Sequence, residues 1–424
     1  MSTHGVQVRG GSGGIEAHYD DMVSAAGLFA SAAAELGHVA LSLHGYLADG
    51  GLITGGVFDP FGATSFEFDL VDALDGPGGV TWLAAKCAAL DVSLRAAATA
   101  YEVGDRVLTQ AHTVLDGVID LPRAATAAGE TFELTGSFAS AFNRFVTQDP
   151  AITDELVLAM GGVRGPALRV ADELMSDGHP VVADRGYDTS PESARPPRSL
   201  ADLIRALSVR DAEAHGAIDV RILTRADGTR SVIVDLPGTK SWQPLPNRDV
   251  TSLAANVRAI VGRSTSYERG VLSALAQAGV RGDDHIMLVG HSEGGMVAVQ
   301  TAIDVAKTRQ FHVTHVVTAG APIGVLAPHV PRDVQVLAIE NAHDMVPHLD
   351  GVTNADRVNV TTCTIGHDSG QIIGDHTLDG TYLAGAADVD ASDDTSIRAF
   401  LSSAQGYLDA TTVETHRFVL TRGR

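Results

Sequence analysis

The sequence predicts an α/β domain with a mostly parallel sheet, preceded by an all-α helical-hairpin domain. Apolar residues recur at heptad spacing through much of the N-terminal quarter, which is typical of long helices packed lengthwise. After residue 216, short apolar runs alternate with helical segments, as in parallel sheets covered on both faces. Residues 186–199 hold three prolines and few apolar side chains, which indicates a linker. We therefore expect a helical domain at 1–185 and an α/β domain at 200–424.

Two heptad series predict the helical hairpin. The second runs from Leu83 to Val118, and at 1.5 Å per residue each helix would be roughly 50 Å long. The simplest arrangement is an antiparallel pair, joined by a long loop at 48–79 because that stretch is rich in Gly, Pro, Phe and Asp. Residues 121–185 are expected to be further helix. The first series consists of Ile15, Tyr19, Met22, Ala26, Phe29, Ala33, Leu36, Ala40, Leu43 and Leu47.

The α/β domain is predicted element by element from residue 217 onward. The runs IDVRILT and RSVIVDL are rich in β-branched residues, and the Asp227-Gly228 pair between them is a strong hairpin signal. A helix is expected over residues 252–278. After it come strand HIMLVG, helix GGMVAVQTAIDVAKT, and strands VTHVVTAG and DVQVLAIE. This order predicts parallel strands, with a crossover helix between the first two.

Composition argues against several classes of function. The 424 residues include 52 acidic and 30 basic side chains, a net charge of −22, so phosphate backbones would repel the chain and no nucleic-acid role is expected. No unbroken run of about 18 apolar residues is present, so no transmembrane segment is expected. The opening residues lack the apolar core of a secretory signal peptide.

The cysteines and histidines give no sign of a metal site or a cofactor. Cys87 and Cys363 are too few for a disulfide framework or a zinc site. We expect two buried free thiols, and whether they pair stays open. The histidines between residues 312 and 348 lack the helical spacing or the cysteine partners of a metal centre. The prediction is therefore no metal and no cofactor.

Ser292 is the candidate nucleophile. The segment GHSEG around it matches G-x-S-x-G, with an apolar strand before it and a helix after it, which is the context that a strained nucleophile turn requires. The glycines permit the crowded turn, and the helix N-terminus favours developing negative charge. The segment GGSGG around Ser12 matches the same pattern, but no strand precedes it, and we interpret it as a flexible tail.

An acid and a base are expected further along the chain, because a serine nucleophile needs an oriented general base. In hydrolase sheets with this turn the chain order is Ser, acid, His. The acid is predicted at Asp344, just past strand DVQVLAIE, with Glu340 and Asp350 as alternatives. The base is predicted at His376, which opens an apparent helix, in preference to His367 in a glycine-rich loop.

The oxyanion site is expected at the loop PGTKSW, which follows strand RSVIVDL. Gly238 in this loop lets the backbone approach a ligand closely. The backbone N–H groups of Thr239 and Glu293 would then face the oxyanion, and such donors contribute about 10²–10³ in rate each.

Residues 200–410 resemble α/β-hydrolases, and most of all class 3 (fungal-type) lipases. The resemblance rests on the PGTKSW loop, the GHSEGG turn, the N-x-x-D-x-V-P turn that contains Asp344, and the segment from His376 to Tyr382. That last segment is one residue longer than the family pattern.

The resemblance implies a catalytic triad of Ser292, Asp344 and His376. It also implies an oxyanion hole at Thr239 and Glu293, and ester hydrolysis without a metal or cofactor. We therefore predict a serine carboxylic ester hydrolase, an esterase or lipase acting on an ester or lipid through an acyl-enzyme. Two alternatives stay open: an acyltransferase with the same triad, and a non-catalytic helical interaction or export-partner protein with a degenerate hydrolase domain.

The N-terminal region resembles substrates of actinobacterial type VII secretion, which are Ala-rich antiparallel helical hairpins with a Tyr-x-x-x-Asp/Glu export signal. Tyr101 and Asp105 fit that signal, although Tyr101 also falls on the heptad seam. The segment WLA at Trp82 departs from the Trp-x-Gly motif of this class. The hairpin is expected to bind a helical partner protein or a second copy of the chain. Location stays open between the cytoplasm and export to the cell envelope or medium without a signal peptide.

Overall fold

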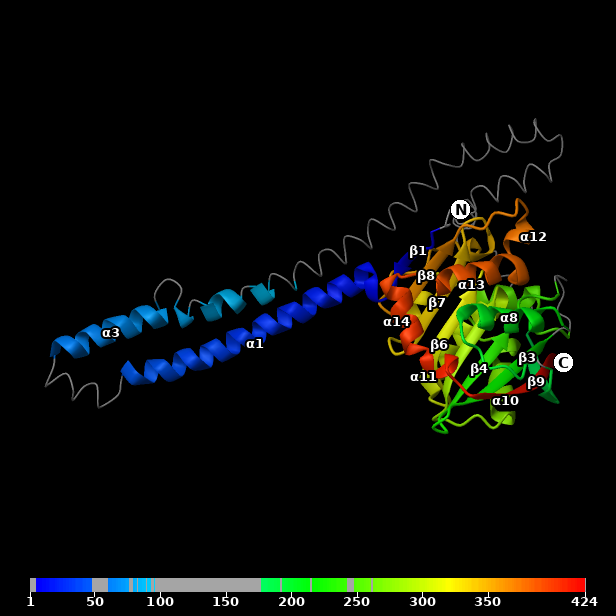
Figure 1. Ribbon diagram of the computed structural model, residues 1–424, viewed down its shortest axis with the longest axis horizontal. Coiled ribbons are helices and arrows are strands. Elements are labelled where there is room, and N and C mark those ends of the chain that lie inside the picture. Colours follow the sequence, from blue (N-terminus) through cyan, green and yellow to red (C-terminus); the bar gives the residue numbers. More distant parts are fainter. Residues whose placement is uncertain are drawn as a thin grey trace, which may run out of the picture. The chain divides into compact units, whose positions relative to one another are not determined.

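The computed structural model describes residues 5–47, 60–75, 79–95 and 177–423, apart from residues 82, 89, 93, 94, 191, 192, 214, 215, 242–247 and 261. The chain divides into two compact units. One is made of Met1–Ile15 together with His112–Arg424, and the other of Glu16–Ala111. The first is an α/β unit and the second is helical (Figure 1).

A nine-stranded mixed sheet forms the centre of the α/β unit, in the order β1-β8-β7-β6-β5-β4-β3-β9-β2. The five central strands β4 to β8 are mutually parallel, and the flanking pairings are antiparallel. The strands are β1 (Gln7–Gly10), β2 (His179–Asp188), β3 (Ala217–Thr224), β4 (Arg230–Leu236), β5 (His285–His291), β6 (His312–Ala319), β7 (Gln335–Asn341), β8 (Val360–Ile365) and β9 (Thr412–Gly423).

Helices cover both faces of this sheet, giving three layers (Figure 1). One face packs against α9 (Leu253–Ile260), α10 (Ser266–Gln277) and α11 (Glu293–Thr308). The other packs against α8 (Leu200–Asp211), α13 (Leu383–Asp390), α14 (Thr395–Ser403) and α15 (Gln405–Leu408). Two separate apolar cores result, as the period-two alternation of buried strands requires.

Alternation along β5 illustrates how the sequence builds these cores. Ile286 and Leu288 face the layer that contains α11, whereas Met287 and Val289 face the layer that contains α8. All four side chains are fully buried, which explains why the strand is a continuous apolar run. The expected hairpin is also present, with β3 and β4 antiparallel and Gly228 at φ +82° in the turn, a conformation that suits glycine.

The single helix expected over residues 252–278 is two helices, α9 and α10. Gly262 between them has φ +71°, which ends the first helix. Thr265 then caps the second, since its side chain accepts a hydrogen bond from the N–H of Glu268.

The expected boundary between the domains is corrected by the two edge strands. β1 and β2 lie outside residues 200–424, yet they form the two opposite edges of the sheet. The expected linker at 186–199 begins inside β2, where Gly186 and Asp188 pair with β9, and Pro197 within it is buried. Residues 179–185, expected to be helical, also belong to β2. Its polar composition is typical of a linker, but the charged side chains of β2 pair with those of neighbouring segments, as Asp188 does with Arg417. Such pairing allows a polar segment to form a strand of the sheet.

The helical unit is therefore inserted between two strands of one sheet. Register shows that β1 ends at the amino edge of the parallel strands, because Gly10 pairs with Thr361 at the start of β8. β2 begins at the opposite, carboxyl edge, because His179 pairs with Gly423 at the end of β9. At about 4.8 Å per strand, the two edges lie roughly 38 Å apart across the sheet.

The segment around Ser12, expected to be a flexible tail, is an ordered turn at Gly11–Gly13. The N–H of Gly13 donates to Ser396 Oγ at 2.9 Å, and that hydroxyl donates to the carbonyl of Gly10 at 2.9 Å. Ser12 itself is exposed. The glycines are required here by packing, since a Cβ on Gly10 would lie 2.2 Å from the carbonyl oxygen of Val360.

The helical unit contains α1 (Ile15–Leu47), α3 (Pro60–Asp75) and helical residues at 83–88 and 90–92. Its limbs are antiparallel where they are described, because His44 Nε2 lies 3.0 Å from Asp75 Oδ2 while Gly27 faces Arg95. On the predicted seam of α1, Ala26 and Ala40 are buried. The later part of the second heptad series, Tyr101 and Asp105 lie outside the described residues.

Helix α3 corrects the loop expected at 48–79. Pro60 opens the helix, where its missing N–H costs nothing. Leu70 and Leu74 then recur at helical spacing, and Leu74 is fully buried. The Gly and Phe content of this stretch hid that period.

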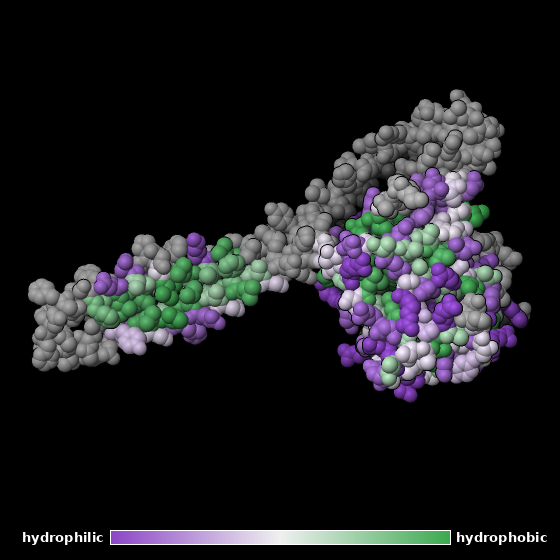
Figure 2. Space-filling view, in the orientation of Figure 1, coloured by the Kyte–Doolittle hydropathy of each residue, from purple (hydrophilic) through white to green (hydrophobic). Residues whose placement is uncertain are grey.

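Large apolar side chains are exposed along the described part of the helical unit. Leu28 and Leu41 are each 74% exposed, and Figure 2 shows this unit as largely hydrophobic. The stretch Val23–Tyr46 is long and apolar enough to cross a membrane by length and composition alone. The prediction that the chain has no transmembrane segment is therefore too strict. A helix can be apolar overall although polar residues such as Glu35 interrupt its apolar runs.

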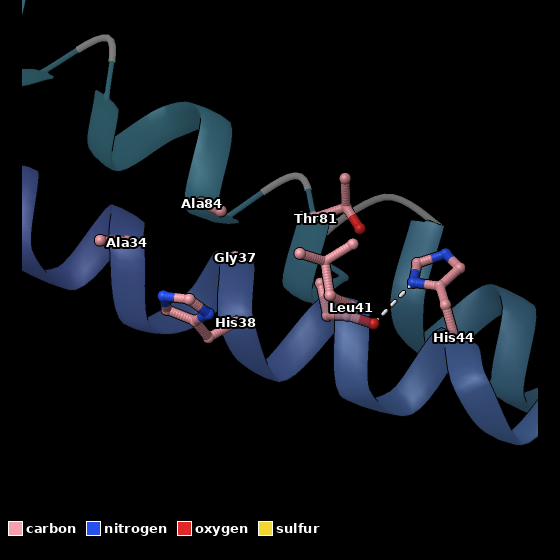
Figure 3. Close-up of a pocket in the computed structure, with 8 residues that line it drawn as sticks. Ala34, Gly37, His38, Leu41, His44, Thr81 and Ala84 are labelled. Atoms are coloured by element: carbon pink, nitrogen blue, oxygen red, sulfur yellow. Dashed lines mark hydrogen bonds between the residues drawn. The ribbon is translucent and has the colours of Figure 1, made fainter.

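A shallow groove of about 450 Å³ lies between the limbs of this unit (Figure 3). Small residues line it from both sides, including Gly37 and Ala40 of α1 and Ala84 of the other limb. Among the described cysteines, both are free: Cys363 is buried in β8, as expected, but Cys87 is only partly buried.

Candidate active site

Ser292 lies at the sharp turn between β5 and α11, as the sequence predicts. Its backbone has φ 53° and ψ −120°, a strained conformation for a residue with a side chain. The N–H of Ser292 donates to the carbonyl of Ala319 in β6 at 2.9 Å, which fixes the turn on the sheet. The residue is 8% exposed and occupies the N-cap of α11, so the positive end of the helix dipole lies beside its hydroxyl.

The glycines of the GHSEGG turn are required by close backbone packing. A Cβ on Gly290 would lie 2.3 Å from the carbonyl oxygen of Gly294, and a Cβ on Gly294 would lie 2.0 Å from that of Leu236. A Cβ on Gly295 would lie 2.5 Å from Ala321 Cβ. The turn is thus pressed against β4 and β6, which explains the glycine pattern by sterics.

Asp344 and His376 form a close pair. His376 Nδ1 lies 2.6 Å from Asp344 Oδ2, and Asp344 is fully buried. The N–H of Val346 donates to the other carboxylate oxygen at 2.9 Å. The His376 side chain is 19% exposed, and its ring lies 4.6 Å from the ring of His291, the residue before Ser292. Nδ1 is engaged by the carboxylate, so Nε2 is the ring nitrogen available to act as a base.

Tyr382 joins this pair. Its hydroxyl donates to Asp344 Oδ2 at 2.6 Å and accepts from the N–H of Asn341 at 3.3 Å. Tyr382 is fully buried at the end of a π-helical turn, Leu378–Tyr382. Such turns accommodate one extra residue in a helix.

The alternative acids and base are engaged elsewhere. His367 Nε2 lies 2.7 Å from Asp388 Oδ2. Glu340 accepts from the side chain of Asn354 at 2.6 Å, and Asp350 accepts from the N–H of Val325 at 3.0 Å. These contacts favour Asp344 and His376 as the acid and the base.

Asn341 holds the loop that carries the histidine. Its Nδ2 donates to the carbonyl of Asp375 at 3.1 Å and to that of His367 at 2.8 Å. This residue belongs to the N-x-x-D pattern, but the sequence assigns it no role. Its position at the end of β7 is the signal that identifies it.

The PGTKSW loop lies against the nucleophile turn, as expected. A Cβ on Gly238 would lie 3.2 Å from Ser292 Cβ, so the bare backbone permits this approach. Thr239 Oγ1 donates to Glu293 Oε2 at 2.9 Å and accepts from Asn256 Nδ2 at 2.6 Å. The structure thus brings the two predicted oxyanion positions, Thr239 and Glu293, together. Trp242 lies outside the described residues.

The backbone donors at these two positions are unused. Neither the N–H of Thr239 nor that of Glu293 donates a hydrogen bond to the residues that the structure describes. The Glu293 side chain is fully buried, and burial raises the pKa of its carboxyl well above the ordinary value. Burial therefore favours the neutral carboxyl over a negative charge beside a developing oxyanion.

A second set of contacts, centred on Asp211 at the end of α8, supports the PGTKSW loop. The sequence patterns did not indicate these contacts. Asp211 Oδ1 accepts from the N–H of Gly238 at 2.9 Å, and Asp211 Oδ2 lies 3.1 Å from Lys240 Nζ. Burial would raise the pKa of Asp211, but His291, Lys240 and the N–H of Gly238 together lower it. His291 Nε2 lies 3.1 Å from the carbonyl oxygen of His376, so the network reaches the base.

Within the described part of the chain, no group of three His, Cys, Asp or Glu side chains is arranged to hold a metal ion. The groove of Figure 3 is lined by residues of the helical unit, and it contains none of Ser292, Asp344 and His376. The candidate chemistry therefore rests on the serine turn and its neighbours.

Comparison with known families agrees with this geometry. Residues 255–381 match the family model of the PGAP1-like alpha/beta domain. That family is of the α/β-hydrolase type, so the mixed sheet, its parallel centre and its flanking helices constitute an α/β-hydrolase-type domain, consistent with a hydrolase. The match covers less than a third of the chain but spans Ser292, Asp344 and His376. It concerns this family and not the class 3 lipases. No curated protein matches the chain.

Proposed function

We propose that the chain is a serine carboxylic ester hydrolase, with Ser292 as nucleophile, His376 as general base and Asp344 as the residue that orients the base. The observation that carries the proposal is the contact between His376 Nδ1 and the buried Asp344, with the His376 ring 4.6 Å from that of His291, the residue before the strained Ser292. A buried carboxylate on Nδ1 selects the tautomer whose Nε2 can accept a proton.

In the proposed reaction, Ser292 Oγ attacks the ester carbonyl carbon while His376 Nε2 takes the hydroxyl proton. The carbonyl oxygen becomes an oxyanion, which the N–H groups of Thr239 and Glu293 stabilise. The alcohol leaves with the proton from His376, giving an acyl-enzyme. Water then loses a proton to His376 and attacks the acyl carbon, which releases the carboxylic acid and restores the serine.

The test is hydrolysis of p-nitrophenyl esters of increasing acyl length by the full chain and by Ser292→Ala. The expected result is activity that falls by roughly 10³-fold or more in the variant. A fluorophosphonate probe should label the wild type at Ser292. Ser12→Ala is the matched control, since that exposed serine has the same G-x-S-x-G pattern and should not be labelled.

The acyl length that is cleaved fastest would separate an esterase from a lipase, the finer prediction from the sequence. Turnover that gives mainly transfer to an added alcohol would identify an acyltransferase with the same triad. The absence of hydrolysis and of labelling at Ser292 in folded protein would refute the proposal and favour a non-catalytic role.

A further inference from the structure

Asp177 is the first residue that the structure describes after residue 95, and it lies directly before β2. β2 starts beside the end of β9, at the same edge of the sheet where β5 delivers Ser292. Asp177 is only 7% exposed although it carries a charge. A buried carboxylate needs partners that offset its charge, and the partners of Asp177 show which segments it links.

Within the described part of the chain, Ser266 and three arginines contact Asp177, and the most distant of these contacts joins Arg258 Nε to Oδ2 at 4.0 Å. Ser266 Oγ donates to Oδ1 at 2.8 Å, and Arg269 Nη2 donates to Oδ2 at 2.7 Å. Arg422 Nη2 donates to Oδ1 at 3.4 Å. Arg269 also donates to the carbonyl of Gly178 at 2.8 Å. Asp177 and Gly178, at the start of β2, are thus anchored on α10 and on the end of β9.

Arg422 continues the network toward the active site. Its Nη2 donates to Ser252 Oγ at 3.2 Å, and its backbone N–H donates to the carbonyl of Arg248 at 2.7 Å. Asp249 forms an isolated bridge with Thr421. The short segment 248–252 is therefore held against the end of β9 by both backbone and side chain.

This segment in turn supports the oxyanion loop. The carbonyl of Thr251 accepts from the N–H of Lys240 at 2.9 Å and from that of Ser241 at 3.1 Å. Ser241 and Ser252 also form a parallel bridge. These contacts act on the two residues that follow Thr239, so they limit where its N–H can point.

We propose that Asp177 is a positioning residue for the oxyanion loop, which acts through Arg422 and Ser252 on the backbone that presents Thr239. This inference rests on the proposed function of that loop. It also means that the start of β2 and the loop at the nucleophile share one anchor.

The experiment compares Asp177→Ala and Asp177→Asn with wild type in the full chain. Asp184→Asn is the matched control, because Asp184 lies in the adjoining strand β2 and contacts His416, away from the loop. We expect kcat on a p-nitrophenyl ester to fall roughly 10- to 100-fold in Asp177→Ala, since small displacements of catalytic groups have effects of that size. KM should stay within about twofold, because the oxyanion contact forms mainly in the transition state.

The kcat of Asp177→Asn should lie between those of wild type and Asp177→Ala, since Asn keeps an acceptor for Ser266 but loses the charge that attracts three arginines. It is also the deciding variant if Asp177→Ala does not fold. Hydrogen exchange gives a second readout that does not depend on activity. The backbone amides of Lys240 and Ser241 should exchange faster in both Asp177 variants than in wild type. In Asp184→Asn their exchange rates should be unchanged.

The inference would be overturned if the Asp177 variants were less stable than wild type but kept its kcat and its exchange rates at these two amides. An equal loss of kcat in Asp184→Asn would also overturn it. If wild type hydrolyses no ester and its serine is not labelled, the proposed function fails, whereas the exchange experiment still decides whether Asp177 anchors the loop.

Discussion

The hydroxyl of Tyr382 donates a 2.6 Å hydrogen bond to Oδ2 of Asp344. This is the same oxygen that His376 Nδ1 contacts, so one carboxylate oxygen is shared by the base and by a buried phenol. Desolvation raises the pKa of Tyr382 well above its ordinary value, so the phenol stays a donor at any working pH. The orientation of Asp344 therefore depends on Tyr382 as well as on the N–H of Val346.

Replacement Tyr382→Phe should lower kcat by about tenfold and destabilise the fold by about 1.5–3 kcal/mol, the usual cost of a lost hydrogen bond to a charged group. Steady-state kinetics and urea unfolding measure the two effects. Tyr407→Phe is the control, because the Tyr407 hydroxyl contacts Thr314 at 2.6 Å, away from the triad. It should lose stability but keep kcat. Wild-type kcat in Tyr382→Phe would contradict the role given to the phenol.

His376→Ala should lower kcat by roughly 10³-fold or more, since the variant has no general base beside Ser292. His367→Ala provides the comparison within the same loop region, because His367 is paired with Asp388. It should keep kcat within about twofold. The ester assay measures both variants. If His367→Ala were the inactive one, the assignment of the base would be wrong.

Glu293→Gln should keep kcat within about threefold, because burial raises the pKa of the Glu293 carboxyl and so favours its neutral form. The amide matches the shape of the protonated acid, and the contribution assigned to this residue comes from its backbone N–H. Glu293→Ala should lower kcat further, since it removes the carboxyl oxygen that accepts the hydrogen bond from the Thr239 hydroxyl. A kcat loss in Glu293→Gln as large as in Glu293→Ala would show that an ionised carboxylate is needed.

Asp235 should make stability depend on pH. It is buried in β4, burial raises its pKa to about 6 against the opposing charge of Arg221, and Asp219 lies opposite it in β3. A carboxyl whose pKa is raised by folding contributes stability below its unfolded value near 3.8, and this contribution is lost as the pH rises through about 6. The wild type should therefore lose stability relative to Asp235→Asn between about pH 4 and pH 7.

Thermal unfolding at several pH values measures this difference in Tm. Asp283→Asn, which changes an exposed carboxylate, is the surface control. A difference in Tm between Asp235→Asn and wild type that stays constant with pH would mean that the Asp235 carboxyl does not titrate where its burial implies.

Strands β4 to β7 of the parallel centre were predictable because each contains a short apolar run, which can be recognised without knowing its partner strand. The nucleophile turn was predictable for a local reason: glycines, a strand and a helix surround Ser292. Asp344 and His376 followed from chain order, and the structure places them 2.6 Å apart.

The edge strands and the supporting residues were not predictable from local pattern. β8 carries threonines, and Thr361 and Thr362 are nevertheless buried. β9 alternates with charged residues such as Arg417 and Arg422, whose charges are met by Asp188, Asp219 and Asp177 from distant parts of the chain. β1 has four residues and a partner about 350 positions away. Such elements depend on pairings that only the folded chain creates.

The edge position of β1 sets the timing of assembly on the ribosome. β1 is translated at residues 7–10, but its partner β8 begins at Val360. At about 5–20 residues per second, synthesis of the intervening chain takes roughly 20–70 s. Until β8 is made, β1 lacks the strand with which it pairs, whereas α1 and α3 are synthesised early in this interval. The sheet is closed at that edge only late in translation, so β1 is made before the other strands but is among the last to pair.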